Sequence, residues 1–561
     1  MDLNPTSDGN HINRALICLL DGVYDQAMRS SEPCQDDRQR ILQDLTLLEP
    51  LYRTLGQCIQ RHVTEKRQQL NSQAPINRLP NELLIKIFTL TLTSDHNEHA
   101  LTPHYIIGLS LVSKDWSRIV FKTPSLWGQI SSRYSERENR VAILRSKGYP
   151  LKVYYSDEDV EGDDYRTLLI RSAIREAHRW QSAIFCLKYD SSLLLLRGAV
   201  SLSAPLLEEL EIDCGDVPAD ILEGENIDLF SGGADHLRHL SLSYFQILWS
   251  SPLLSRLETL TIMGSPIVPS PTASELTDIL RRCPKLYKFA MITIDEIRVL
   301  GDARSEVGIA YLPALKSFTL HLRNPEAFNR ILSSVRIPEC TMFSLRCSRA
   351  TRNIFSDETS HITTALLSAI RSTPNISLSL SLSELNLTGR RTEDDPGIDI
   401  TLNGDSPWEL LASIIEPSVP WPPIDAYISC NELPYLQVTD LLGRIPSITT
   451  VHLTGNSDQY IAYLSYPTLN DCTYEWVLPN LRELTLKDCP QNNSQVLTDL
   501  LRNLQARAVM NQGDGVQKGL RMKLEKLHVV MMNHHGYPMT RPFYVALRQR
   551  RGNGWDGNMI D

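Results

Sequence analysis

The fold of the first part of this chain is decided by the segment Ile76-Asn-Arg-Leu-Pro-Asn-Glu-Leu-Leu-Ile-Lys-Ile-Phe88. Its apolar residues recur three and four positions apart, which is the spacing of one face of an α-helix. Pro80 stands where the first helical turn tolerates proline, and Glu82 places negative charge near the positive end of the helix dipole. The segment therefore predicts a helix with a broad apolar stripe, formed by Leu79, Leu83, Leu84, Ile87, Phe88 and Leu90.

A second helix is predicted after a polar loop that runs from Thr93 to His104. The segment Thr123-Pro-Ser-Leu-Trp127 follows it and predicts a turn. Together these helices carry more apolar surface than about 50 residues can bury internally, so they should pack against the rest of the chain or against another protein. The stripe of the second helix consists of Leu109, Val112, Trp116 and Ile119, spaced by three, four and three.

The order of these parts resembles the F-box, and in particular the F-box-like proteins that are abundant in mushroom-forming fungi. In that family a Leu-Pro pair opens the first helix, a Val-Ser/Cys-Lys/Arg-x-Trp segment closes a later one, and a Thr-Pro-x-Leu-Trp turn ends the module. The preceding helix and two downstream segments also match, so the resemblance covers roughly residues 40 to 215. The matching segments are Leu79-Pro80, Val112-Ser-Lys-Asp-Trp116, Thr123-Pro-Ser-Leu-Trp127, Arg145-Ser-Lys-Gly-Tyr-Pro-Leu151 and His178-Arg-Trp180.

The resemblance implies a docking surface for a Skp-type adaptor and, through that adaptor, for a cullin. Such a surface works by removing apolar area from water, and a few large side chains usually dominate the binding energy. Some of the matching residues must instead hold the F-box together. A charge placed at Leu83 or Ile87 is expected to abolish docking. The residues that match the docking motif are Leu79, Pro80, Leu83, Leu84, Ile87, Phe88, Val112 and Trp116.

An amphipathic helix is predicted before the F-box, where apolar residues lie along one stripe up to about residue 70. Pro50 falls inside this stripe and should kink the helix or split it in two, because proline lacks the backbone donor and clashes with the preceding turn. The stripe suits either a coiled-coil-like dimer or a helix that lies on its own domain. Its residues are Leu45, Leu48, Tyr52, Leu55 and Ile59.

The long C-terminal region repeats a triplet of apolar residues at positions i, i+3 and i+5. Helical patterns precede several triplets, as Thr272 to Arg282 precedes Leu286, and this order of helix, turn and short strand predicts a leucine-rich-repeat-like solenoid with a parallel sheet. A set of unrelated amphipathic strands is the alternative. Two long gaps could each hide a degenerate unit, with Cys340/Phe343/Leu345 as a candidate for the first. The triplets are Leu207/Leu210/Ile212, Leu237/Leu240/Leu242, Leu257/Leu260/Ile262, Leu286/Phe289/Met291, Leu315/Phe318/Leu320, Leu382/Leu385/Leu387, Ile448/Val451/Leu453, Leu481/Leu484/Leu486 and Leu524/Leu527/Val529.

The residues that alternate with the inward apolar ones are predicted to line the concave face of this sheet, because successive side chains of a strand point to opposite faces. The predicted face is acidic at its start and mixed at its end, and it holds no arginine cluster of the kind that reads phosphate. We predict that it meets a protein substrate through Glu209, Glu211, His239, Thr259, Thr261, Lys288, Thr319, His321, Thr450, His452, Glu483, Lys487, Lys526 and His528.

The predicted fold class is α+β or α/β, with an N-terminal helical segment and an F-box bundle followed by an irregular leucine-rich-repeat-like α/β solenoid. At 561 residues the chain is too long for one hydrophobic core, so several structural units are expected. The predicted boundaries are 1–34 for a flexible lead-in, 35–72 for the amphipathic helix, 76–128 for the F-box, 129–200 for a connecting α/β segment, 201–545 for the substrate-recognition domain and 546–561 for a flexible tail.

Charge and cysteine usage narrow the functional classes. A formal net charge of −10 and a pI near 5.8 disfavour nucleic acid or an anionic membrane as the main partner. The 11 cysteines are scattered singly, without a CxxC pair, which fits a reducing compartment. Because no signal peptide or membrane-spanning stretch is recognisable, the expected location is the cytoplasm, the nucleus or both.

No catalytic motif, metal-ligand spacing or cofactor fingerprint stands out in the sequence. Together with this absence, the resemblance to the F-box family implies a non-catalytic adaptor, the substrate-recognition subunit of an SCF-type (Skp-cullin-F-box) ubiquitin ligase, without a cofactor or a metal. Two alternatives remain, a repeat-based interaction scaffold with a non-proteolytic role and an enzyme with an unrecognised site.

Overall fold

The computed structural model divides between Leu126 and Trp127 into two compact units. Predictions for the lead-in, for loop 94–102 and for residues 547–561 fall almost entirely outside the described residues. Apart from a few positions before residue 37, the structure describes residues 37–93, 103–159, 163–189, 202–215, 229–245, 247–264, 271–293, 308–350, 354–355, 360–391, 397–415, 421–430, 433, 435–455, 458–465, 468–470, 473–475, 478–489, 526–531 and 543–546.

The first unit begins with one long helix, α2 (Asp37–Gln73), of 37 residues. Pro50 lies inside α2 without ending it, so of the two predicted effects the split into two helices is wrong, while the kink stays a prediction. A proline removes one backbone hydrogen bond at a cost of about 3 kcal/mol, and a helix of this length keeps its other turns. The helix, predicted up to about residue 70, continues as far as Gln73.

The F-box segment folds into three α-helices and two short 3-10 helices. The single second helix predicted from residue 109 to residue 119 is wrong, because the chain breaks at Ser113. The Ser113 backbone is extended, at φ −156° and ψ 163°, and its hydroxyl accepts a hydrogen bond from the Trp116 amide at 3.1 Å. Serine competes for helix amides in this way at N-caps. The elements are η1 (Pro75–Arg78), α3 (Asn81–Thr93), α4 (Pro103–Val112), α5 (Lys114–Lys122) and η2 (Pro124–Trp127).

The second unit is built on one sheet, to which 17 strands belong in the described part of the chain. Neighbours pair in the order β1-β2-β3-β4-β5-β6-β7-β9-β11-β14-β13-β12-β15-β16-β19-β20-β21, and all pairs are parallel except those that involve β13 or β21. We call this sheet the strand ladder. Its strands are β1 (Gln129–Ser131), β2 (Leu151–Ser156), β3 (Trp180–Cys186), β4 (Glu209–Asp213), β5 (His239–Ser243), β6 (Thr259–Gly264), β7 (Lys288–Thr293), β9 (Ser317–Leu322), β11 (Met342–Cys347), β12 (Asn375–Leu380), β13 (Glu384–Arg390), β14 (Ile398–Asn403), β15 (Ile424–Ser429), β16 (Ile448–Thr454), β19 (Glu483–Cys489), β20 (Lys526–Met531) and β21 (Phe543–Ala546).

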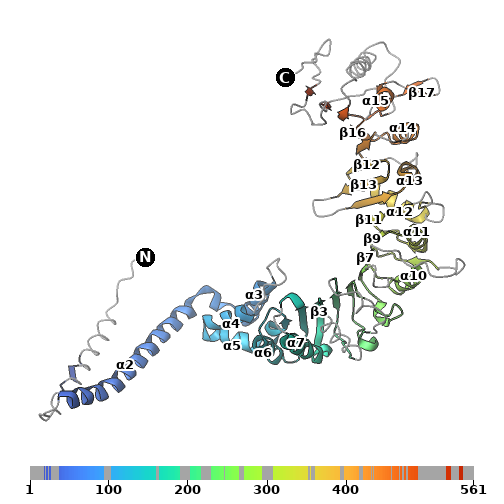
Figure 1. The fold of residues 1–561 in the computed structure, drawn as a ribbon. Coiled ribbons are helices and arrows are strands. Elements are labelled where there is room, and N and C mark those ends of the chain that lie inside the picture. The colour runs from blue at the N-terminus through green and yellow to red at the C-terminus, as the bar shows by residue number, and fades with distance from the viewer. Residues whose placement is uncertain are drawn as a thin grey trace. The chain divides into compact units, whose positions relative to one another are not determined.

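Helices connect the strands, and α10 to α14 line one side of them (Figure 1). Helix α10 begins with a capping box, in which Thr272 and Glu275 each satisfy the other's free backbone amide. The helical elements are α6 (Glu136–Ser146), η3 (Asp157–Asp159), α7 (Asp163–Arg175), η4 (Ala177–Arg179), η5 (Leu229–Gly232), η6 (Pro252–Leu254), α10 (Ala273–Arg282), α11 (Pro325–Ser334), α12 (Ser360–Arg371), α13 (Pro407–Ile414), α14 (Tyr435–Gly443) and α15 (Asp458–Ser465). Two further pairs of short strands are β8 (Ala310–Tyr311) with β10 (Val335–Arg336) and β17 (Thr468–Asn470) with β18 (Thr473–Glu475).

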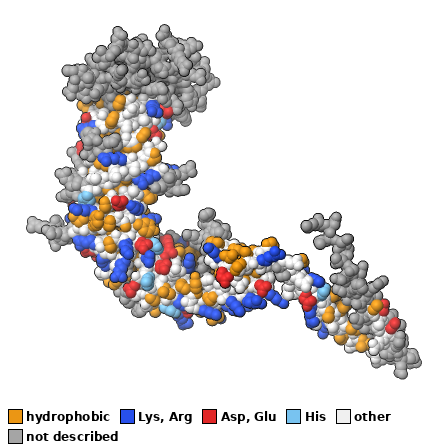
Figure 2. All heavy atoms as spheres, turned by 180° about the vertical axis from the view of Figure 1, so that it is seen from behind, with side chains coloured by type: hydrophobic (Ala, Val, Ile, Leu, Met, Phe, Trp, Pro, Cys, Tyr) orange, Lys and Arg blue, Asp and Glu red, His pale blue; other side chains and the backbone are white. Residues whose placement is uncertain are grey.

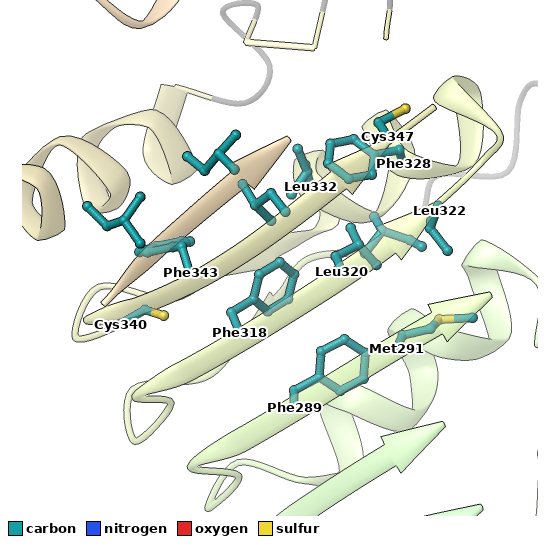
Figure 3. Packing of buried hydrophobic residues seen from close by; sticks show 14 of the residues in the cluster. Phe289, Met291, Phe318, Leu320, Leu322, Phe328, Leu332, Cys340, Phe343 and Cys347 are labelled. Carbon is teal, nitrogen blue, oxygen red and sulfur yellow. The ribbon is translucent and has the colours of Figure 1, made fainter. Parts of the chain in front are cut away.

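The core lies between the ladder and its helices. Phe289, Phe318 and Phe343 occupy the same register position on β7, β9 and β11, and each is at most 1% exposed (Figure 3). The rings of Phe289 and Phe318 stack, with centroids 5.6 Å apart. Each strand thus adds one apolar layer to a continuous core, as in proteins whose units contact only their neighbours.

The triplet Leu382/Leu385/Leu387 does not form a parallel repeat strand. Leu385 and Leu387 lie in β13, which runs antiparallel to both of its neighbours, while Leu382 is 41% exposed. A period of two reveals that a strand is half-buried and carries no information about its direction. Cys340/Phe343/Leu345, the candidate for the first gap, does supply a parallel strand, β11 beside β9.

The ladder also begins before residue 201, the predicted start of the repeat region. The segment 129–200 contributes β1, β2 and β3, and β3 pairs directly with β4. It is therefore part of the sheet rather than a connector. The buried residues Trp180, Ala183 and Phe185 keep the i, i+3, i+5 spacing without a leucine, which is why the repeat was not recognised.

Candidate protein-docking surfaces

The F-box has a small core that uses three of its eight predicted docking residues. Leu84, Phe88 and Trp116 are 3%, 1% and 9% exposed. The rings of Phe88 and Trp116 lie 4.7 Å apart between centroids. Side chains buried in this way hold α3 and α5 together and offer almost no area to a partner.

A chain of hydrogen bonds ties this core to the end of α2. The Trp116 Nε1–H donates to Asn77 Oδ1 at 2.6 Å, and the Asn77 Nδ2 group donates to the Asn71 carbonyl at 2.5 Å. The Asn71 Nδ2 group in turn donates to the Val112 carbonyl at 3.4 Å. The buried indole therefore has a partner for its donor, and α2 enters the F-box in a fixed register.

The other predicted docking residues are accessible. Leu83 is 47% exposed and Val112 50% exposed, Pro80 is exposed, and Leu79 and Ile87 are half-buried. Leu90 was predicted on the apolar stripe but not as a docking residue, and Ile107 and Leu111 of α4 were not predicted at all; these three side chains are 56%, 39% and 80% exposed. We call these eight residues the F-box apolar face. Because α4 is apolar on all sides, its periodicity could not separate buried from exposed positions.

Residues 76–133 match the family model of the F-box-like domain. The chain thus carries an F-box-like domain, and the prediction of an F-box protein is confirmed. No curated protein matches the chain. An F-box domain implies an adaptor that binds a Skp-type protein within SCF-type complexes, and proteins with this domain are generally non-catalytic.

The predicted substrate-facing residues lie on the side of the ladder opposite its core, which we call the polar face. On each strand for which burial is described they alternate with residues that are almost completely buried, as for His321 beside Leu320 and Leu322 in β9. The strand register brings Glu209, His239, Thr259 and Lys288 into one row. For Lys526 and His528 the structure describes only the backbone position in β20. Lys526 lies opposite Glu483 of β19, and His528 lies opposite Thr485.

The polar face is acidic at β4, whose sequence is Glu209-Leu-Glu-Ile-Asp213. Burial, followed by the carboxylates of Asp213 and Glu211, raises the pKa of the Cys186 thiol to about 11. The thiol therefore remains protonated at neutral pH, which makes it a poor nucleophile and metal ligand. On the surface seen in Figure 2, cationic and anionic side chains are interspersed with uncharged and hydrophobic ones.

Sequence reasoning missed the polar-face residues of strands outside its triplets. Tyr427 of β15 is 42% exposed and stacks on His452 of β16, with ring centroids 4.3 Å apart and planes inclined by 9°. Arg346 of β11 pairs with Asp399 of β14 at 2.8 Å. Alternation along the candidate strand β11 would have revealed Arg346, and alternation along β14 and β15 would have revealed Asp399 and Tyr427 had these two strands been recognised.

Neither a membrane span nor a metal cluster is present among the residues that the structure describes. No described helix is both long enough and apolar enough to cross a bilayer. No group of three or more His, Cys, Asp or Glu side chains in the described ranges could hold a metal ion.

Proposed function

We propose that this chain is the substrate-recognition adaptor subunit of an SCF-type ubiquitin ligase. The F-box apolar face docks a Skp-type adaptor, which connects to a cullin, and the leucine-rich-repeat-like ladder offers its polar face to a protein substrate. Such a subunit performs no bond chemistry and acts by raising the effective concentration of substrate near a conjugating enzyme. Its scattered single cysteines fit action in the cytoplasm or nucleus.

The observation that carries this proposal is the F-box-like match together with a solvent-facing apolar surface on the same helices. Leu83, Leu90 and Leu111 on this surface are 47%, 56% and 80% exposed. Removing such apolar area from water lowers the free energy, so binding of a partner there is favourable.

Leu83→Asp is expected to weaken co-purification of the full chain with a Skp-type adaptor and a cullin by about thirtyfold or more, because binding would bury an unpaired carboxylate. Quantitative pull-down of the tagged chain from cells measures the effect. Leu144→Asp is the matched control, since Leu144 is 71% exposed on α6, outside the F-box match. Undiminished adaptor binding by the Leu83 variant would contradict the proposal.

A scaffold with a non-proteolytic role would dock the same adaptor, so a second measurement is needed. Cells that carry only the Leu83→Asp chain should accumulate the ligase substrate, and proximity labelling with intact and Leu83→Asp chains should identify it. The scaffold role would be favoured if the wild-type chain bound the adaptor and no protein rose in abundance in the cells that carry only the Leu83→Asp chain.

We further propose that α2 pairs with the α2 helix of a second copy of the chain. Its apolar stripe is accessible, with Leu45, Leu48, Tyr52 and Ile59 between 49% and 80% exposed. The residues alternate spacings of three and four, which is the pattern of a coiled-coil seam. A helix whose stripe remains in water gains little stability from its own unit.

Leu48→Asp is expected to raise the dissociation constant of this dimer about tenfold or more, because it places a charge in the apolar seam. Analytical ultracentrifugation of the full chain, which has a mass of 63.5 kDa, measures the association. Gln57→Asp is the control, because residue 57 lies off the stripe on the same helix. A wild-type chain that stays monomeric at micromolar concentration would rule the pairing out.

A further inference from the structure

Four polar side chains on three neighbouring strands form a connected cluster on the polar face. His321 comes from β9, Ser344 and Arg346 from β11, and Asp399 from β14. The register sets His321 opposite Arg346 and Ser344 opposite Asp399. His321 Nε2 lies 2.8 Å from Ser344 Oγ, and Asp399 Oδ2 lies 3.3 Å from Ser344 Oγ and 2.8 Å from the Arg346 guanidinium.

The hydrogen bonds fix where the protons are. A carboxylate only accepts, so the single hydroxyl proton of Ser344 is donated to Asp399. Ser344 Oγ must then accept from His321 Nε2–H, which leaves a lone pair on Nδ1. Burial, and after it the positive charge of Arg346, lowers the pKa of His321. The ring is therefore uncharged at neutral pH, and Nδ1 is a hydrogen-bond acceptor.

The cluster therefore presents an acceptor and a donor on adjacent strands. No hydrogen bond within the described residues engages His321 Nδ1. The Arg346 side chain is 54% exposed and, among the described contacts, gives a hydrogen bond only to Asp399, although a guanidinium has five N–H donors. His321 and Arg346 are register partners on adjacent strands, and the strands of a sheet are about 4.8 Å apart.

The charge balance of the cluster disfavours an anionic ligand. The positive charge of Arg346 is compensated by Asp399 at 2.8 Å, and His321 adds none. A bound carboxylate or phosphate would meet the Arg346 guanidinium, whose charge Asp399 already compensates. It would also be repelled by the Asp399 carboxylate and by the lone pair on His321 Nδ1. A primary amide fits better, because its carbonyl accepts from the guanidinium while its N–H donates to Nδ1.

We propose that this cluster binds the side-chain amide of an asparagine or glutamine in the protein substrate. The inference rests on the proposed function in that a substrate lies on the polar face, and it adds the chemistry of the group that is read. Asp399 and Ser344 act as positioning residues, since they orient the guanidinium and the imidazole that touch the amide.

The test uses immobilised peptides of random sequence with one fixed central residue, which is Asn, Gln, Ser, Asp, Glu or phosphoserine. Labelled full-length chain is expected to bind the Asn and Gln pools about fivefold more strongly than the three anionic pools. Asp399→Asn frees the charge of Arg346, so its preference should shift toward the anionic pools. Asp440→Asn is the matched control, because Asp440 of helix α14 makes a similar 2.6 Å ion pair with Arg444.

Three outcomes would overturn the inference: stronger wild-type binding to anionic pools, equal binding to all pools, or an unchanged preference in Asp399→Asn. The peptide measurement requires no ligase component, so it is independent of adaptor docking. A chain that prefers amide pools yet fails to co-purify with a Skp-type adaptor would contradict the proposed function alone.

Discussion

Replacing Trp116 with alanine is expected to unfold the F-box helices while the strand ladder stays intact. Removing a buried aromatic side chain costs about 4 kcal/mol, and a helical bundle of this size rarely has more stability than that. The change deletes the contact with Phe88, whose ring centroid is 4.7 Å away, and strips Asn77 Oδ1 of its 2.6 Å donor. Hydrogen exchange followed by mass spectrometry of the full chain should show lost amide protection in α3, α4 and α5.

Two companion variants separate folding from docking. Trp116→Phe keeps an aromatic ring beside Phe88 and loses the indole donor, so it should weaken protection less than alanine does. Leu83→Asp changes a side chain that is 47% exposed, so it should leave protection unchanged while adaptor binding is lost. Normal protection of α3 and α5 in the alanine variant would show that Trp116 does not stabilise the bundle.

The F-box was recognisable from sequence because its motif couples residue types to an order along the chain. The motif could not say which residues are buried, since Leu83 and Leu84 are both leucines on one broad stripe. The structure separates them at 47% and 3% exposure. The break at Ser113 was equally hidden, because the spacing of Val112 and Trp116 is the same in one continuous helix and across a capped break.

Most parallel strands of the ladder were predictable where leucine occupies positions of the i, i+3, i+5 triplet. The ladder was hidden where other buried residues serve the same purpose, as Trp421, Ile424 and Ala426 do for β15. The pairing of β14 with β11, across two intervening strands of sequence, depends on long-range hydrogen bonds that no local pattern specifies. The cluster at Asp399 was missed for this reason, because its members come from strands β9, β11 and β14.

Phe318→Ala is expected to lower the free energy of unfolding of the ladder by about 4 kcal/mol, through lost apolar burial and the cavity left behind. Phe318 is fully buried, stacks on Phe289 at 5.6 Å and shares its register position with Phe343. Each strand contacts mainly its two neighbours, so the damage should be greatest in β7, β9 and β11. Urea unfolding of the full chain, combined with hydrogen exchange of these strands, measures both its size and its spread.

Ser317→Ala is the control for this prediction, because it changes the preceding residue of the same strand on the opposite, polar face. A substitution there should alter stability by no more than about 0.5 kcal/mol. If both variants lost similar stability, the two faces of β9 would not differ as the burial pattern requires. A loss confined to Phe318→Ala, with exchange raised in β7 and β11 as well, would establish that the phenylalanine row joins these strands into one cooperative unit.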